Sequence, residues 1–186
     1  GKWEKKNIKG TELSKKTLGI VGFGNVGARL SNLVKGFGVN ILVSSKSLES
    51  RKKDFPHVKN VSFDELISTS DIISFHCKAA PDGKPLISKE HYKKIKPTAV
   101  IINTARGNIV DENDLNAALN ENLIAGAALD VYSKEPAKEN ILFNNPQAIL
   151  TPHVAASTAE ASIVVAEMAA NQISDFLLKG TKINTV

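Results

Sequence analysis

A glycine-rich turn carries the most specific chemical signal in this sequence. A short β-prone run at residues 18–21 stops at Gly22, and Gly24 and Gly27 complete the pattern G-x-G-x-x-G. Gly22 permits a tight turn, Gly24 lets backbone approach a pyrophosphate, and Gly27 lets the next helix pack closely on the strand. A glycine turn without a ligand is the alternative. The strand–turn–helix context favours a dinucleotide-binding site.

Further polar side chains follow the later predicted strands. His76, Arg106, Asp130 and His153 come directly after four successive apolar runs. Because ligands of a parallel sheet bind outside the carboxyl ends of its strands, we expect these side chains to share one site. Taken singly, His76 could simply end a strand, Arg106 could be a surface arginine, and His153 could be a hydrogen-bonded core histidine. Cys77 fits best as a small buried hydrophobe.

The elements that must position these residues alternate along the chain. Apolar, β-prone runs predict strands at 18–21, 39–43, 58–61, 71–75, 99–103, 124–129 and 148–150. Between them we expect helices at 26–37, 63–67 and 89–94, and one capped by Asp111 that carries Leu115, Ala118 and Leu119 on one face. The first of these helices has an apolar stripe at helical spacing: Val26, Leu30, Leu33, Val34 and Phe37. This alternation predicts an α/β fold, a Rossmann-type doubly wound parallel sheet.

A long final helix is expected at residues 157–179. Ser157 and Glu160 have capping-box spacing, and Gly180 is the expected stop. Its apolar stripe comprises Ala161, Val165, Met168, Gln172 and Phe176. Residues 1–16 are polar and lysine-rich and indicate an N-terminal arm or hinge. We therefore expect one dinucleotide-binding domain over residues 1–186.

Composition excludes several classes of function. The chain has 186 residues, of which 42% are hydrophobic and 23% charged, which is typical of a soluble globular protein. No apolar run reaches the length of a membrane span, and the N-terminus does not resemble a signal peptide. The single cysteine favours a cytoplasmic location. The net charge of +5 comes from scattered lysines, so we expect a solvated surface, no nucleic-acid partner, no membrane partner and no metal site.

Five ordered motifs carry a family resemblance. They are the glycine turn, residues 102–107 (INTARG), 128–132 (ALDVY), the pair Glu135 and Pro136, and 150–153 (LTPH). Together they resemble the D-isomer-specific 2-hydroxyacid dehydrogenases. Residues 155–158 (AAST) and 176–180 (FLLKG) look most like the phosphoglycerate dehydrogenases of that family. The resemblance spans essentially the whole chain.

The resemblance implies hydride transfer between C2 of a D-2-hydroxy acid and a nicotinamide. Arg106 would bind the substrate carboxylate as a bidentate fork, which a lysine could not do. His153 would take the hydroxyl proton as general base, and Glu135 would pair with it and favour the imidazolium. Asp130 would hold the nicotinamide carboxamide. The other implied cofactor contacts are Gly22, Gly24, Asn25, Val26, Gly27, Ser44, Ser45, Lys46, His76, Thr104 and Ala105.

The cofactor could be NAD or NADP. The family usually has an aspartate at the end of the second strand, whereas this chain has Ser44, Ser45 and Lys46 there and no carboxylate until Glu49. An acid repels a 2′-phosphate, and serine and lysine can accept one, so we expect NADP to be tolerated. The alternative is that Ser45 still bonds the ribose and NAD dominates. A second departure is Lys78, where family members often have proline.

The implied function is the cofactor-binding domain of an oxidoreductase, with 3-phosphoglycerate as the first substrate candidate. Glyoxylate, hydroxypyruvate and lactate are alternatives, and a corepressor-like dinucleotide sensor is the alternative function. The family's substrate-binding domain has no counterpart in these 186 residues, so we expect the chain to bind a dinucleotide without turnover. The resemblance also implies a homodimer formed through the cofactor domain.

Overall fold

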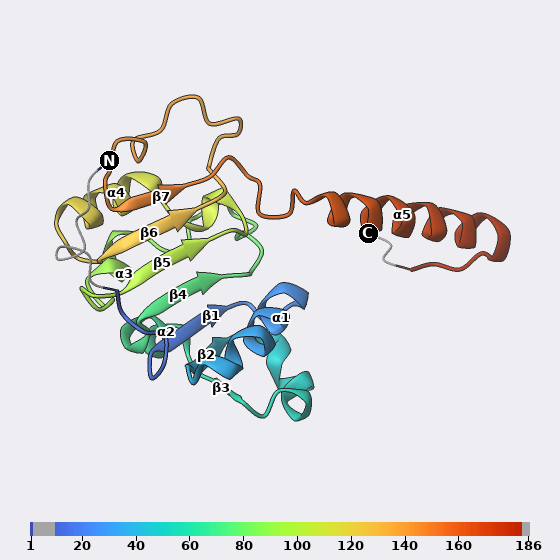
Figure 1. The fold of residues 1–186 in the computed structure, drawn as a ribbon, viewed down its shortest axis with the longest axis horizontal. Coiled ribbons are helices and arrows are strands. Elements are labelled where there is room, and N and C mark those ends of the chain that lie inside the picture. The colour runs from blue at the N-terminus through green and yellow to red at the C-terminus, as the bar shows by residue number, and fades with distance from the viewer. Residues whose placement is uncertain (2–9, 184–186) are drawn as a thin grey trace. The chain divides into compact units, whose positions relative to one another are not determined.

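A computed structural model of the chain describes Gly1 and residues 10–183. Its central feature is a parallel sheet, which within the described residues has seven strands in the order β3-β2-β1-β4-β5-β6-β7 (Figure 1). The strands are β1 (Thr17–Val21), β2 (Asn40–Ser44), β3 (Val58–Asn60), β4 (Ile72–Phe75), β5 (Val100–Asn103), β6 (Gly126–Leu129) and β7 (Ala148–Leu150). The predicted doubly wound parallel sheet is confirmed, with strand ends that differ from the predicted ones by two residues at most.

Helices separate most of these strands. They are α1 (Asn25–Val34), α2 (Phe63–Thr69), α3 (Lys89–Tyr92), α4 (Glu112–Asn120) and α5 (Ala159–Lys179), with 3₁₀ segments η2 (Lys35–Phe37), η3 (Lys46–Asp54) and η4 (Gly107–Ile109). Asp111 caps α4 as predicted, and Leu115, Ala118 and Leu119 are buried. Half of the predicted arm at residues 1–16, namely residues 2–9, lies outside the described part of the chain.

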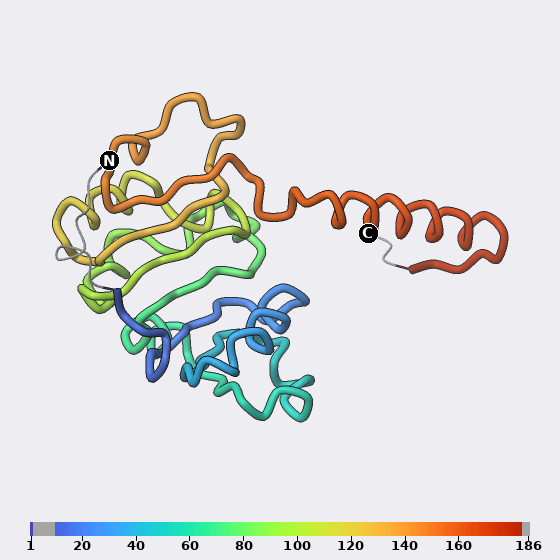
Figure 2. The backbone as a smooth tube through the Cα atoms, viewed as in Figure 1, coloured from blue at the N-terminus to red at the C-terminus, as the bar shows by residue number. Residues whose placement is uncertain are grey.

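The order of the strands reverses beside β1. The chain steps from β1 to β2 and β3, then returns to β4 on the other side of β1 and continues outward to β7 (Figure 2). Such a reversal places a crevice at the carboxyl ends of the two strands that flank it, here β1 and β4. The residues that follow these strands are therefore the first candidates for a ligand site.

The core lies on both faces of the sheet. Leu18 and Ile20 of β1 pack with Ala28 of α1 in one apolar cluster. Val21, the next residue along β1, belongs to a second cluster that contains residues of α2, α3 and α4. Successive residues of a strand point to opposite faces, so the two clusters cover the two sides of the sheet.

The buried face of α1 differs from its apolar stripe. Gly27, Ala28 and Ser31 are the buried residues of this helix, whereas the side chains of Val26 and Leu33 are 63% and 65% exposed. The glycine turn explains the small buried residues, because Gly27 brings the start of α1 close to β1. Of the predicted stripe, Leu30 and Val34 are partly buried against the core, whereas Val26, Leu33 and Phe37 are exposed.

The chain divides into two compact units, Gly1–Pro152 and His153–Val186. The second unit contains α5, which ends at Gly180 in the left-handed conformation, as predicted. The predicted cap at Ser157 is wrong: Thr158 is the N-cap, and its hydroxyl accepts from the Ala161 N–H at 3.0 Å. The helix consequently begins two residues later than expected. No helix among the described residues is both long and apolar enough to cross a membrane.

Candidate functional site

The three glycines of the turn have different surroundings. Gly22 has a φ of 90°, and a Cβ there would collide with the backbone of His76 and Cys77, directly after β4. A Cβ on Gly27 would meet the Gly22 carbonyl, whereas one on Gly24 would meet nothing within 4 Å. Gly22 and Gly27 therefore allow β1, β4 and α1 to pack together. Gly24 instead faces open space, as the approach of a phosphate requires.

The amino terminus of α1 is suited to an anion. Its N-cap, Gly24, makes no side-chain capping bond, and no acidic residue lies in the first turn. In contrast, Ser62 caps α2 and Asp111 caps α4 through their side-chain oxygens. The first N–H groups of α1 and its positive dipole end are consequently available to phosphate oxygens. This part of the structure fits the pyrophosphate of a dinucleotide.

A hollow of about 230 Å³ lies beside this turn. Its lining includes five of the predicted site residues, contributed by α1 and by the segments that follow β4 and β5: Val26, His76, Thr104, Ala105 and Arg106. Cys77 and Lys78 complete the lining. The structure thus brings together residues up to 80 positions apart in the sequence, at the point where the strand order reverses.

Asn103 shapes the loop that carries Arg106. The Asn103 side chain is fully buried; its amide donates to the Arg106 carbonyl at 2.9 Å, and its oxygen accepts from the Ala105 N–H at 3.1 Å. The Arg106 guanidinium is exposed and donates to the Ala105 carbonyl at 2.6 Å. Asn103 was not predicted as a site residue, although a buried asparagine at the end of an apolar strand is a signal for such a role.

His76 lies at the hollow as a partly buried side chain. Its Nε2 is 2.9 Å from the Ser74 hydroxyl, and burial lowers the pKa of His76. The imidazole is therefore neutral near pH 7 and can hydrogen-bond a ligand without adding charge. Burial also raises the pKa of the neighbouring Cys77 thiol. That cysteine packs against the core, although it is partly rather than fully buried.

A hydrogen-bond network joins the ends of β6 and β7. Asp130 is 3% exposed, and the Thr151 hydroxyl donates to its carboxylate at 2.5 Å. The Tyr132 hydroxyl donates to the Thr151 carbonyl at 2.9 Å, and the Tyr132 N–H donates to the Glu135 carboxylate at 2.9 Å. Tyr132 and Thr151 were not predicted as site residues. They connect the segment that carries Glu135 to the strand that leads to His153.

His153 is the first residue of the second compact unit. Its φ is 55°, in the left-handed region that residues other than glycine seldom adopt. Such conformations occur at functional sites, where surrounding structure maintains them. Because His153 and Glu135 belong to different units, their pairing stays a prediction.

Two hydroxyls link the end of β2 to the glycine turn. Ser45 caps η3, and its Oγ lies 2.9 Å from that of Ser47. Ser47 in turn donates to the Phe23 carbonyl at 3.1 Å. Ser44 is the last residue of β2, where its carbonyl accepts from the Gly22 N–H, and Lys46 is exposed. The predicted serines thus lie beside the turn that would hold the pyrophosphate.

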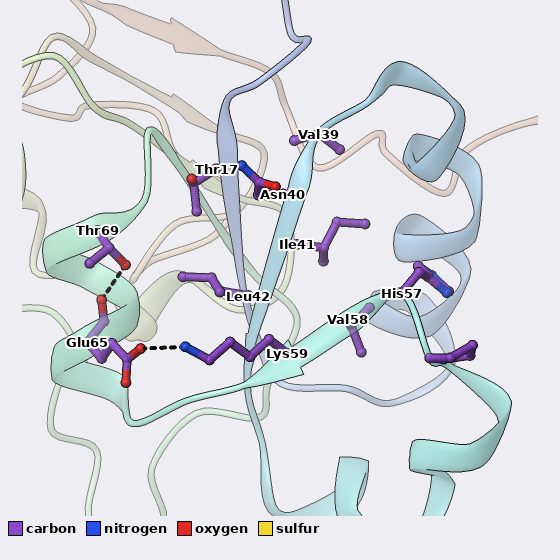
Figure 3. Close-up of a pocket in the computed structure, with 11 residues that line it drawn as sticks. Thr17, Val39, Asn40, Ile41, Leu42, His57, Val58, Lys59, Glu65 and Thr69 are labelled. Atoms are coloured by element: carbon purple, nitrogen blue, oxygen red, sulfur yellow. Dashed lines mark hydrogen bonds and ion pairs between the residues drawn. The ribbon is translucent and has the colours of Figure 1, made fainter.

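A larger hollow, of about 560 Å³, lies elsewhere on the sheet (Figure 3). Its lining includes Thr17, Asn40 and Val58, which are the first residues of β1, β2 and β3. It lies toward the amino ends of these strands and contains none of the predicted site residues. The mostly exposed ion pair between Lys59 and Glu65 is at its edge. Since ligands of such sheets bind at the carboxyl ends, the smaller hollow is the better candidate.

Comparison with known proteins identifies the family. The NAD binding domain of the D-isomer specific 2-hydroxyacid dehydrogenases matches residues 1–155. The chain belongs to this family. It is 42% identical to the D-3-phosphoglycerate dehydrogenase of Synechocystis sp. over 95% of the chain and 32% of that protein. It is 37% identical to the glyoxylate reductase of Thermococcus litoralis over 95% of the chain and 55% of that protein.

A solved structure of this dehydrogenase family has the same fold. The glyoxylate reductase from Paecilomyes thermophila superposes with a TM-score of 0.87 at 34% identity, over 97% of this chain and 55% of that one. The chain therefore spans about a third to about half of the length of these relatives. The predicted family and its NAD-binding domain are confirmed, while the roles of the individual site residues stay predictions. Relatives with different substrates are similarly related, so the substrate is not fixed.

Proposed function

We propose that this domain serves a dehydrogenase that transfers hydride between a D-2-hydroxy acid and a nicotinamide dinucleotide. The observation that carries the proposal is the hollow at the strand reversal, where Val26, His76, Thr104, Ala105 and Arg106 meet beside the uncapped helix α1. When bound, the nicotinamide supplies or accepts the hydride. The glycine turn and the start of α1 would hold the pyrophosphate.

Three residues would handle the substrate. The exposed Arg106 guanidinium would bind its carboxylate through two parallel hydrogen bonds. His153 would hold the proton of the hydroxyl group, and Glu135 would orient the imidazole and stabilise its charged form. Asp130, buried after β6, would bind the nicotinamide carboxamide. These roles rest on the family resemblance and on the positions of Arg106, Asp130 and Glu135 after parallel strands.

Substitutions in the complete enzyme test these roles. His153→Ala should abolish turnover and leave dinucleotide affinity nearly unchanged, because the phosphate site lies elsewhere. Arg106→Lys should lower kcat/KM through loss of the fork. Steady-state rates and dinucleotide titrations measure both effects. If the His153 variant keeps most of its activity, the histidine is structural and the proposed mechanism is wrong.

For the substrate we propose 3-phosphoglycerate, and hence a role in serine biosynthesis. The similarity to D-3-phosphoglycerate dehydrogenases supports it, and the similarity to glyoxylate reductases supports glyoxylate or hydroxypyruvate instead. Lactate is a further alternative. Assays of the complete enzyme with all four compounds decide between them. A kcat/KM for 3-phosphoglycerate below that for glyoxylate would refute the proposal.

We further propose that NADP is accepted alongside NAD. Ser45, Lys46 and Ser47 directly follow β2, where an acid would select NAD. Titration of the chain with both dinucleotides tests this. A preference for NAD above about a hundredfold, or about 2.7 kcal/mol, contradicts it.

The remaining proposals are a cytoplasmic location and a homodimer that forms through this domain. The apolar side chains of Leu33 on α1 and Phe37 on η2 are 65% and 60% exposed and support an association surface. Sedimentation of the complete enzyme tests the dimer, and fractionation of cells tests the location. A monomer at micromolar concentration would contradict the proposed dimer.

A further inference from the structure

Arg51 lies beside the glycine turn although it follows Gly27 by 24 residues. Its Nη1 donates to the Phe23 carbonyl at 3.3 Å, and its guanidinium carbon lies 5.0 Å from the Phe55 ring centre and 5.9 Å from that of Phe23. The two rings are buried and pack edge to face. The guanidinium is thus held on a fixed aromatic platform while the side chain stays partly exposed.

Most of the hydrogen-bonding capacity of Arg51 remains available. A guanidinium has five N–H donors, and within the described part of the chain one of them has an acceptor, the Phe23 carbonyl. The Ser47 hydroxyl donates to this same carbonyl, and Ser45 lies next to Ser47. A guanidinium and two hydroxyls therefore gather between the end of β2 and the glycine turn.

The nearest acid in the sequence is engaged elsewhere. Glu49 is the first carboxylate after β2, and it accepts from the Asn60 side-chain amide at 2.6 Å. The Asn60 oxygen in turn accepts from the Ser45 N–H at 3.5 Å. Asn60 is the last residue of β3, so this contact holds Glu49 toward that strand. The usual acid that repels a 2′-phosphate is missing, and Glu49 is not free to replace it.

The end of β2 is where the adenosine ribose lies when a pyrophosphate sits on the start of α1. We propose that Arg51 is a specificity-determining residue that binds the 2′-phosphate of NADP, together with Ser45 and Ser47. This inference rests on the proposed dinucleotide function. A planar guanidinium matches a phosphate through paired, charge-assisted hydrogen bonds. The aromatic platform orients it in advance, which reduces the entropy lost on binding.

Titrations of the chain with NAD and NADP test the role of Arg51. Arg51→Met should weaken NADP binding by about tenfold or more, as expected for lost hydrogen bonds to a charged group, and change NAD affinity by less than about threefold. Arg51→Lys should show a smaller loss, because it keeps the charge without the fork. The control is Lys53→Met, which removes the same charge from an exposed side chain of η3 and should change neither affinity.

Smaller probes separate phosphate recognition from folding. Arg51→Met should weaken binding of 2′,5′-ADP and leave that of 5′-AMP unchanged. In the unsubstituted chain, added salt should lower the affinity for 2′,5′-ADP more than for 5′-AMP, since salt screens an exposed charge pair. This comparison needs no variant and holds even if Arg51→Met unfolds the chain.

Four outcomes overturn the inference. If Arg51→Met weakens both dinucleotides equally, the arginine only holds η3 against the turn. If NADP binding is unchanged, Arg51 does not contact the 2′-phosphate. An unsubstituted chain that binds NAD and excludes NADP refutes the inference and leaves the dinucleotide function standing. A folded chain that binds neither refutes the proposed function as well.

Discussion

Tyr132 connects several segments of the candidate site through its hydroxyl, its backbone and its ring. Its hydroxyl donates to the Thr151 carbonyl, its backbone N–H donates to Glu135, and its ring packs against Phe143. The Tyr132 carbonyl occupies the space that a Cβ on Gly107 would need, so the loop that carries Arg106 packs against the Tyr132 backbone. The backbone around Tyr132 thus touches the segments of two predicted catalytic residues, Arg106 and Glu135.

Replacing Tyr132 by phenylalanine should lower the free energy of unfolding by about 1 kcal/mol, the net value of one buried hydrogen bond. The ring contact with Phe143 is kept, so the loss reports the hydroxyl alone. The matched control is Tyr92→Phe. The Tyr92 hydroxyl is buried without a hydrogen-bond partner in the described structure, so its removal should cost nothing. Urea denaturation measures both variants, and equal losses would contradict this account.

At the scale of elements, the glycine turn combines two separate physical requirements. Gly22 and Gly27 allow the close packing of β1, β4 and α1, whereas Gly24 leaves space outside the chain. The same six-residue motif therefore contains positions that determine stability and one that should determine binding.

Two alanine substitutions separate these requirements. Gly27→Ala places a Cβ against the Gly22 carbonyl and should lower the free energy of unfolding by about 1–3 kcal/mol through overpacking. Gly24→Ala meets no atom, and its φ of −77° suits alanine, so it should cost less than about 1 kcal/mol. It should nevertheless weaken dinucleotide binding by about tenfold, because the methyl group lies where the phosphates approach. Thermal unfolding and titration measure the two effects, and the reverse pattern would contradict them.

Asp71 joins the starts of β1 and β4 and gives the sheet a pH dependence. The Thr17 N–H donates to its carboxylate at 2.8 Å, and Lys96 pairs with it at 3.0 Å. The hydrogen bond from Thr17 is the main reason that the pKa of Asp71 lies below its ordinary value of 3.8. Burial opposes this effect, and Lys96 lowers the pKa further. Because the pKa is lower in the folded state than in the unfolded state, the carboxylate stabilises the fold at pH values above its unfolded-state pKa. This stabilisation is lost as the pH falls through the folded-state pKa.

Asp71→Asn should therefore lower the free energy of unfolding by about 1–2 kcal/mol at pH 7. The difference from the unsubstituted chain should shrink as the pH falls below about 4, where the carboxylate becomes protonated in the unfolded state first. Denaturant titrations at a series of pH values measure this. Asp54→Asn, on η3, is a suitable control because it removes the same charge from an exposed side chain. A difference that stays constant down to pH 2 would rule out the Asp71 carboxylate as its source.

At the scale of the whole molecule, the proposed function requires more than this chain contains. The chain spans 32% of the Synechocystis relative and 55% of the Thermococcus relative. The phosphate-binding turn is complete within it, while the Arg106 guanidinium is exposed. Catalysis requires that substrate be held within reacting distance of the nicotinamide, which an exposed arginine alone cannot achieve.

The 186-residue chain should therefore bind a dinucleotide without oxidising a hydroxy acid. Calorimetric titration measures the binding, and the absorbance of the reduced nicotinamide measures turnover. The complete enzyme under the same conditions is the positive control. Robust turnover by this chain alone would show that the second half of the site is not needed.

The sequence by itself determined the features that depend on neighbouring residues. Alternating apolar runs predicted the strands and their order along the chain, the glycine spacing predicted the binding turn, and Asp111 and Gly180 predicted helix ends. These signals are local, because turns, caps and apolar periodicity require residues only a few positions apart.

Tertiary structure alone decided the features that depend on distant segments. It placed Arg51 against Phe23, Tyr132 against Thr151, and Val26 and Leu33 of α1 toward the outside. None of these follows from local pattern, since each depends on which strands become neighbours and how closely they approach. Gly27 brings the start of α1 so near to β1 that the buried residues of this helix are Gly27, Ala28 and Ser31, which the spacing of its larger apolar side chains did not indicate.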